Sequence, residues 1–430
     1  MASPLSAVTQ FFRHPDLRRK FLTVIGLLVV SRFISSVPLP GVDKTNLQNF
    51  LTTNTAFSLL NIFTGGGLLN FSIALMGVGP YITSSIIFQL LTLVIPSLEN
   101  LSKEGEFGRR KINQYTRLAA VPLALIQGFG TLTYLKNAQI ISQWTVGHLA
   151  FMLTIATGGT LLLMWIGELI SEQGIGNGLS LLITSGIVAT FPAQLQKSYE
   201  AYSGGISGPQ LLQIIGFVVV AALALLLIIF MSEGQRNIPV SYAKRVRGTK
   251  VYGGVDTNLP IKVNAAGVVP IIFAVSMVLF PSIIAQFLRQ AQSIKVRNVG
   301  DTIYNFFSNQ NHYAVVYFVL VIAFTFFYTF IIFQPKQMAE NLQKQGGFIP
   351  GIRPGQDTET YLYTVIQRLT FTGALFLAVI AVLPIVVQQI TKVQTLNLGG
   401  TSLLIVVAVV LEVMRQVRAQ MITRTYELYS

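Results

Sequence analysis

Long apolar runs constrain the fold of this chain more than any other feature. About ten of them approach the roughly 17–25 residues that a helix needs to cross ~30 Å of hydrocarbon. They lie near residues 21–37, 72–95, 117–135, 148–167, 179–192, 211–231, 264–287, 313–333, 364–390 and 401–421. Only 11% of the 430 residues are charged, whereas a soluble globular chain carries about 25%. The sequence therefore predicts an all-α polytopic membrane protein with ten transmembrane helices.

The distribution of lysine and arginine predicts the orientation of these helices. An even number of spans places both termini on the same side of the membrane. If that side is cytoplasmic, 20 of the 30 basic residues fall in inside segments and 7 in outside segments. This bias is the one expected from the positive-inside rule. The expected topology therefore has a cytoplasmic N-terminus and a cytoplasmic C-terminus.

Two of the expected cytoplasmic loops contain patterns of soluble structure. Residues 234–263 alternate apolar and polar side chains between glycine-containing turns, which predicts a basic β-hairpin. Residues 335–347 have a proline at the first position and two glycines at the end, which predicts a short polar helix. Both elements are expected to project from the membrane.

Two segments of the chain resemble each other although their expected directions are opposite. GVGPYI at residues 77–82, in the second span, is similar to GVVPII at residues 267–272, in the seventh. Five spans separate them, so the similarity suggests an inverted repeat, which usually places the functional path between the two halves. Six matched positions alone leave chance similarity as an equal alternative.

The segment LLNIFTGGGLLNFSIALMGVGPY, residues 59–81, is apolar but contains three consecutive glycines and two asparagines. Inside a bilayer, irregular backbone is tolerated only where protein or a water-filled cavity surrounds it. We therefore expect residues 57–70 to form a short re-entrant helix in a protein cavity, with the second span starting near Ser72. A closely packed glycine-rich helix and an outer loop are the alternatives.

Patterns of enzyme chemistry are sparse. Cysteine is absent, and the three histidines are far apart, near or outside span ends, without metal-binding spacing. An ion-coupled carrier would suit an inverted repeat, but the candidate ionisable residues lie near span ends, where structural pairing or headgroup contact is the simpler role. These residues are Arg32, Glu168, Glu172, Glu412 and Arg415. We expect no catalytic residue, metal site or cofactor, and an inverted-repeat solute carrier is the alternative function.

Several longer strings, spread in order along the chain, resemble the SecY family, the channel subunits of the bacterial SecYEG-type protein translocase. They are GVGPYITSSIIFQLL from residue 77, KEGEFGRRKINQYTR (103–117), GELISEQGIGNGLSLLI (167–183), YAKRVRGTKVYGG, LPIKVNAAGVVPIIFA (259–274), GGFIPGIRPGQDTETYL (346–362) and GGTSLLIVVAVVLEVM (399–414). The resemblance implies a protein-conducting channel and no enzyme. Such a channel translocates unfolded secretory polypeptides and inserts membrane proteins laterally into the membrane.

The resemblance also implies a domain organisation in two inverted, pseudo-symmetric halves around an hourglass pore. The expected parts are a cytoplasmic N-terminus (1–20), a half with spans 1–5 (21–192), an external hinge loop (193–209), a half with spans 6–10 (210–421) and a cytoplasmic C-terminus (422–430). The second half would carry cytoplasmic loops at 234–263 and 334–360. The re-entrant helix would be the plug that closes the pore from outside, and we call residues 57–70 the plug segment. Its expected functional residues are Phe63, Gly65, Gly66, Gly67 and Asn70.

The family's pore constriction falls on apolar, β-branched residues of this chain. We call these positions the apolar ring: Val78, Ile82, Ile86, Ile183, Ile187, Ile272 and Ile405. From periodicity alone, the stripe of Val78, Ile82 and Ile86 would only suggest contact with lipid or the protein core. The resemblance further implies a lateral gate between the second and seventh spans, at Thr83, Gln89 and Phe280.

The basic cytoplasmic loops match the family surfaces that meet the ribosome or the SecA motor. The matching residues are Lys244, Arg245, Arg247, Lys250 and Arg353. Basic side chains suit ribosomal RNA phosphates. The other partners implied by the resemblance are SecE-like and SecG-like small membrane subunits, signal sequences, nascent polypeptides and the lipid bilayer. The implied location is the bacterial plasma (inner) membrane.

Overall fold

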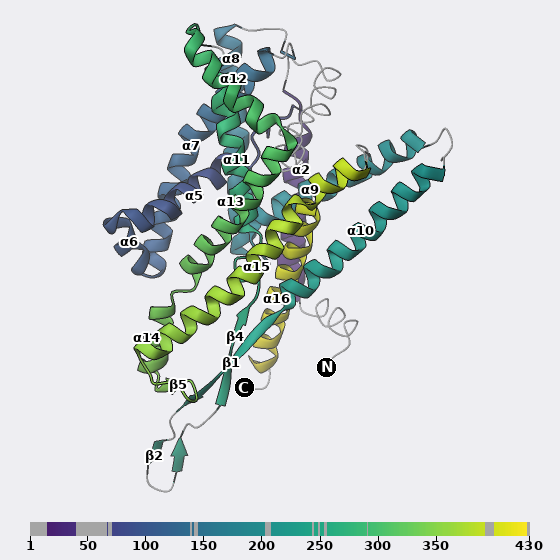
Figure 1. Ribbon diagram of the computed structural model, residues 1–430. Coiled ribbons are helices and arrows are strands. Elements are labelled where there is room, and N and C mark those ends of the chain that lie inside the picture. Colours follow the sequence, from purple (N-terminus) through teal and green to yellow (C-terminus); the bar gives the residue numbers. More distant parts are fainter. Residues whose placement is uncertain are drawn as a thin grey trace. The chain divides into compact units, whose positions relative to one another are not determined.

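The computed structural model describes residues 15–39, 67, 71–137, 140–141, 145–202, 208–242, 245–247, 250–252, 256–289, 291–391 and 400–427. These residues form helices and a small amount of antiparallel sheet (Figure 1). The chain divides into two compact units. Unit 1 comprises Met1–Gly204, Leu279–Ser308 and Val409–Ser430, and unit 2 comprises Gly205–Val278 and Asn309–Ala408. We describe each unit separately.

Unit 1 is a bundle of antiparallel helices packed around an apolar core. Its helices are α2 (Pro15–Ser36), α5 (Gly79–Val94), α6 (Pro96–Lys103), α7 (Glu106–Asn137), α8 (Val146–Glu172), α9 (Gly178–Tyr202) and α12 (Ile294–Ser308), with the C-terminal parts of α11 (Val269–Leu288) and α16 (Gly400–Glu427). α5 packs against α7, α7 against α8, and α8 against α9, while α2 contacts both α8 and α9. The core contains Leu39, Phe71, Leu75, Met76, Leu132, Leu135, Ile140, Ile141, Met152 and Ala156.

A close approach of backbones fixes α8 against the segment that precedes α5. A Cβ atom on Gly159 would overlap the carbonyl oxygen of Ile73. The adjacent residue, Gly158, has open space at the same position. Of these two glycines, only Gly159 is therefore needed for packing.

This pair of glycines gives a stability prediction with an internal control. Gly159→Ala should destabilise the protein by about 1–3 kcal/mol, because the methyl group forces α8 away from Ile73. Gly158→Ala should be neutral or slightly stabilising, since alanine is the better helix former. Thermal unfolding of both variants in detergent measures the difference. Equal midpoints for the two variants would show that the close approach does not constrain the bundle.

Unit 2 combines apolar helices with a small sheet. Its helices are α10 (Gly208–Glu233), α13 (Gln310–Ile332), α14 (Pro335–Lys344), α15 (Gln356–Thr391) and the N-terminal parts of α11 and α16. α13 packs along α15, and α10 and α14 also contact α15. Strand β1 (Gln235–Tyr242) pairs antiparallel with β4 (Asp256–Lys262) and with β5 (Gly347–Phe348), and β2 (Arg245–Arg247) pairs with β3 (Lys250–Tyr252).

The sheet is held on the N-terminal part of α15 by its own apolar core. Ile238 and Val240 of β1 point to one side of the sheet, because they are two residues apart. Ile261 of β4 points to the same side, because it pairs with Arg236, which lies two residues before Ile238. They pack with Ile349, Leu362, Val365 and Ile366. The loops that connect the membrane helices of unit 2 therefore form a folded subdomain.

Both soluble elements predicted in the loops are confirmed. Residues 235–262 form a long antiparallel hairpin whose tip is the β2–β3 pair. The predicted polar helix is α14, which has Pro335 at its first turn and is followed by Gly346 at a φ of +72°. Glycine adopts this left-handed conformation without steric cost.

The helices lie at the positions of the predicted spans, but only some of them are long and apolar enough to cross a membrane by themselves. A helix lies over each of the ten predicted spans. Among the described residues, three helices are long and apolar enough to cross a membrane by themselves, or four if α5 and α6 form one bent span. They are Val146–Glu172, Gln310–Lys344 and Gln356–Val387. The count of ten spans therefore stays a prediction, while the predominantly helical membrane fold is confirmed.

Two predicted boundaries are wrong. The second span was expected to begin near Ser72, but residues 71–78 form turns and α5 begins at Gly79, after Gly77 at a φ of +53°. Most of the loop expected at 193–209 is helical, because α9 continues to Tyr202. Its sequence AQLQKSYEAY after Pro192 consists largely of good helix formers.

Candidate functional site

The two similar segments of the sequence form the same local structure in the two units. Gly77 in unit 1 and Gly267 in unit 2 adopt φ values of +53° and +65°. In each case a helix begins two residues later with proline at its second position, giving α5 and α11. The backbone turn therefore supports the similarity of GVGPYI and GVVPII as a structural repeat.

This repeated turn places two isoleucines at equivalent positions. Ile82 and Ile272 each follow the positive-φ glycine by five residues, and both amides donate to the carbonyl of the residue four positions before, at 3.1 Å and 3.3 Å. Both side chains are 8% exposed. Equivalent burial at equivalent positions is expected if the two residues serve the same role in their units.

All seven residues of the apolar ring are buried. The five in unit 1 are between 2% and 9% exposed, and the two in unit 2, Ile272 and Ile405, are 8% and 1% exposed. By contrast, large apolar side chains on α10 and α13 are more than half exposed, including Val219 and Val319. The ring positions therefore do not belong to the surface that would face lipid.

The residues that flank positions 40–70 are hydrogen-bonded to each other in unit 1. The Leu39 amide donates to the Phe71 carbonyl at 2.7 Å, and the Ile73 amide donates to the Val37 carbonyl at 3.0 Å. Leu39 and Phe71 are both buried in the core of unit 1. The two described segments on either side of residues 40–70 are therefore joined in the core of unit 1.

Of the plug segment, the structure describes Gly67 alone; Phe63, Gly65, Gly66 and Asn70 lie outside the described residues. The Gly67 carbonyl accepts hydrogen bonds from the amide and the hydroxyl of Ser72, at 3.0 Å and 3.2 Å. A Cβ atom at this position would overlap the carbonyl oxygen of Ala74. Glycine is therefore required at 67 by packing.

The polar residues expected at the lateral gate have partners within unit 1. The Thr83 hydroxyl donates to the Gly79 carbonyl at 3.1 Å and accepts from Gln127 Nε2 of α7 at 3.3 Å. Gln89 Nε2 donates to the Ser85 hydroxyl at 3.4 Å, while Gln89 Oε1 is buried with no hydrogen-bond partner among the described residues. Phe280 lies in α11, but its side chain is outside the described residues. Sequence reasoning missed Gln127, because no pattern links it to Thr83.

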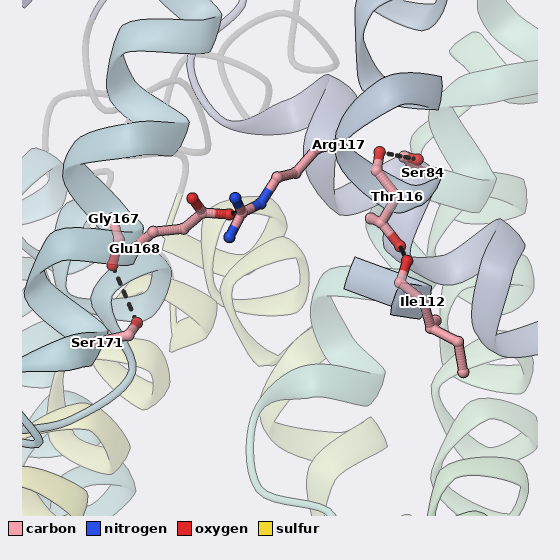
Figure 2. A network of polar contacts seen from close by, with 7 residues as sticks. All are labelled: Ser84, Ile112, Thr116, Arg117, Gly167, Glu168 and Ser171. Atoms are coloured by element: carbon pink, nitrogen blue, oxygen red, sulfur yellow. Dashed lines mark hydrogen bonds and ion pairs between the residues drawn. The ribbon is translucent and has the colours of Figure 1, made fainter. Parts of the chain in front are cut away.

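An ion pair joins α7 to α8 in unit 1 (Figure 2). Arg117 Nε lies 2.5 Å from Glu168 Oε1, and the Glu168 side chain is 20% exposed. One helical position away on α7, the Thr116 carbonyl accepts from the Ser84 hydroxyl of α5 at 2.7 Å. The expected role of Glu168 in structural pairing is therefore confirmed. Arg32 likewise donates to Ser185 of α9 at 3.3 Å.

The loop between α8 and α9 is held by two glutamines of α16 in unit 1. The Gly176 amide donates to Gln416 Oε1, and Gln420 Nε2 donates to the Gly174 carbonyl at 2.7 Å. Gly174 and Gly176 have φ values of +71° and +107°, which other residues rarely adopt. The two glutamines are four residues apart, about one helical turn, so they lie on the same face of α16. This face contacts the loop at both Gly174 and Gly176.

The loop that carries Arg353 is rigidly built while its side chain is exposed. Gly351 and Gly355 adopt φ values of +82° and +106° on either side of it. The buried Thr358 hydroxyl donates to the Arg353 carbonyl at 2.8 Å. Ile349, in the same loop, is part of the apolar core of the subdomain. The backbone is therefore fixed, and the guanidinium is presented to solvent.

The basic residues of the hairpin tip are described by their backbone only. Arg245 and Arg247 alternate along β2, and Lys250 of β3 pairs with Arg247. Lys244 lies outside the described residues. The register thus brings three of the four predicted basic positions to one short ladder.

Comparisons with known proteins match this architecture. A family model described as SecY covers residues 72–414. The protein translocase subunit SecY of Mycobacterium tuberculosis (strain ATCC 25618 / H37Rv) is 42% identical, over 98% of this chain and 99% of its own. The chain belongs to the SecY family. It is therefore a multi-pass membrane protein of the channel type that translocates proteins, and the solute-carrier alternative is not favoured.

Solved structures of the same family share the fold. The TM-score is 0.63 to a SecY protein whose plug domain stabilises the closed state of its channel and maintains a membrane seal; that chain is 20% identical, with 93% of this chain and 91% of that chain covered. The TM-score to Sec61 in the canine ribosome–channel complex is also 0.63, at 18% identity, with 93% of this chain and 91% of that chain covered. At these identities the similarity shows the SecY fold alone.

Proposed function

We propose that the apolar ring forms the constriction of a polypeptide channel and that the plug segment closes this constriction in the resting state. The observation that carries the proposal is the equivalent placement of Ile82 and Ile272 after repeated glycine turns, with both side chains buried. A constriction of β-branched apolar side chains resists water and ions by dewetting. It can still deform around a passing chain, because dispersion contacts are non-directional.

The bonded ends of residues 40–70 support the role of the plug segment. Because the flanking residues Leu39 and Phe71 are bonded to each other and buried, the plug segment is proposed to move without disturbing the core of unit 1. Irregular backbone within the hydrocarbon region of a membrane must be enclosed by protein or line a water-filled cavity. A location within the channel satisfies that requirement.

Lateral release to lipid is proposed to occur between α5 and α11, at Thr83, Gln89 and Phe280. The weak side-chain bond of Thr83 to Gln127, at 3.3 Å, supports the assignment, as does Gln89 Oε1, which has no hydrogen-bond partner within the described part of the chain. Polar groups that are incompletely paired within a helix bundle can exchange partners at modest cost.

The partners proposed for the cytoplasmic face are the ribosome and the SecA motor, bound through Arg353 and the basic hairpin. The exposed, rigidly mounted Arg353 supports this assignment, as does the similarity to Sec61 in a ribosome–channel complex. SecE-like and SecG-like subunits are proposed as membrane partners. The termini are proposed to be cytoplasmic in a bacterial plasma membrane, and the energy for transport is proposed to come from the partner, with no catalysis by this chain.

Deletion of residues 57–66 tests the seal. The deletion removes most of the plug segment but keeps Gly67 and its contacts with Ser72 and Ala74. Ion conductance of the channel, purified with its small subunits and reconstituted in planar bilayers, should rise well above that of the parent. Conductance equal to the parent, with the same amount of protein inserted, would contradict the plug assignment.

A further inference from the structure

Helix α12 lies directly against the C-terminal end of α11. A Cβ atom on the buried Gly300 would lie 2.8 Å from the Arg289 amide nitrogen and 3.0 Å from the Ala285 carbonyl oxygen. The Arg289 Nε is 2.6 Å from Asp301 Oδ1, and its guanidinium carbon is 4.3 Å from the centre of the Tyr304 ring. These contacts fix α12 at the end of an apolar helix, α11 (Figure 1).

One apolar stripe of α12 is left uncovered by this packing. Val296, Val299, Ile303 and Phe306 are spaced three or four residues apart and so share one side of the helix. Val299 is 53% exposed, Phe306 43% and Val296 37%. Asn298 and Asn305, which are both exposed, occupy the opposite side, and the exposed Thr302 lies at the edge of the stripe.

The charges next to this stripe are positive. Lys295 and Arg297 are exposed and form no ion pair within the described part of the chain. Asp301, the acidic residue of α12, is already neutralised by Arg289. An amphipathic helix with basic residues beside its apolar stripe is suited to a bilayer surface, where the stripe enters the acyl boundary and the cations meet lipid phosphates.

Continuity with α11 favours lipid over a protein partner. Ile284 of α11, in the same unit as α12, is 41% exposed, so the end of the helix that leads to α12 presents an apolar side chain to its surroundings. α12 begins six residues after the end of α11, which keeps it at the depth where α11 reaches the membrane surface. A lipid boundary that covers Ile284 can extend to the stripe of α12.

We propose that α12 is an interfacial helix that inserts its stripe of Val296, Val299, Ile303 and Phe306 into the bilayer surface and binds anionic phospholipid headgroups through Lys295 and Arg297. The leaflet is the one that the C-terminal end of α11 reaches, which is the outer one in the proposed topology. The helix anchors the end of α11 at a fixed depth. This proposal does not depend on the assignment of the apolar ring or the plug segment.

The absence of native cysteine makes the stripe directly measurable. Spin labels would be attached to single-cysteine variants of the full chain at the stripe, V299C and F306C, and at the polar side, N298C and N305C. Each variant, with its small subunits, would be reconstituted in phosphatidylcholine vesicles with and without phosphatidylglycerol. Collision with oxygen and with a water-soluble nickel complex then reports lipid and water exposure.

The stripe labels should collide preferentially with oxygen and the polar-side labels with nickel. Phosphatidylglycerol should move the stripe labels deeper, and this shift should be lost in a Lys295→Gln, Arg297→Gln background but kept with Lys336→Gln on α14. Frequent collision of the labels at 299 and 306 with nickel would overturn the proposal. Protection of both labels from oxygen and from nickel would also overturn it, because that result indicates a protein partner over the stripe. If phosphatidylglycerol does not change the depth of the stripe labels when Lys295 and Arg297 are both present, the assignment of these residues to headgroup binding is wrong.

Discussion

Arg353→Glu is expected to abolish ribosome- or motor-driven transport while the protein still folds and assembles with its partners. The side chain is exposed and the surrounding backbone is held by Gly351, Gly355 and Thr358. Charge reversal would therefore remove the proposed docking contact without removing a packing contact. A charge-assisted hydrogen bond contributes about 1.5–3 kcal/mol, which corresponds to roughly tenfold to a hundredfold in binding.

The measurement is translocation of a secretory polypeptide into inverted membrane vesicles, together with binding of the motor or ribosome. Lys336→Glu is the matched control, because Lys336 is an exposed basic residue of the same subdomain with an ordinary topological role. The control should transport normally. Normal transport by Arg353→Glu, or loss of the variant from the membrane, would each contradict a docking role.

Replacement of a ring isoleucine by asparagine should make the closed channel leak. Ile82→Asn and Ile272→Asn each add an amide that can bind water in a constriction otherwise too apolar to stay wet. We expect a raised resting ion conductance and acceptance of poor signal sequences, with nearly normal amounts of protein in the membrane. Conductance in planar bilayers and export of a marker with a defective signal sequence measure the two effects.

Ile271 supplies the control on the same helix. It is 0% exposed and adjacent to Ile272. If Ile271 is an ordinary core residue, Ile271→Asn should instead destabilise the fold by about 1–3 kcal/mol, the cost of a buried amide without partners, and lower the yield without a leak. If Ile82→Asn and Ile272→Asn behave like Ile271→Asn, the ring residues are core residues and the constriction lies elsewhere.

Local patterns predicted a helix over each of the ten apolar runs and the sheet subdomain of unit 2. Apolar runs located the membrane helices, and strand alternation with glycine turns located the hairpin that pairs Gln235–Tyr242 with Asp256–Lys262. The similarity of GVGPYI and GVVPII was weak as a sequence match. It becomes a structural repeat through the φ values of Gly77 and Gly267, which no sequence pattern reports.

Contacts between distant segments could not be predicted. Gly158 and Gly159 are indistinguishable in sequence, yet only Gly159 meets the Ile73 backbone. The bond of Gln127 to Thr83 joins residues 44 positions apart, and Gln420 reaches a loop 246 positions away. Such pairs follow from how helices pack, and a periodicity along one helix does not reveal its partner.

Disulfide formation with an arrested translocating polypeptide tests the central claim most directly. A single cysteine would be placed at 82 or 272, or at the exposed positions 219 and 319, in a chain that has none of its own. A secretory polypeptide with one cysteine would be arrested partway through the membrane and oxidised. Our account predicts strong cross-links from I82C and I272C and none from V219C and V319C. Absence of cross-links from both ring positions, with the polypeptide arrested across the membrane, would contradict the assignment of the constriction.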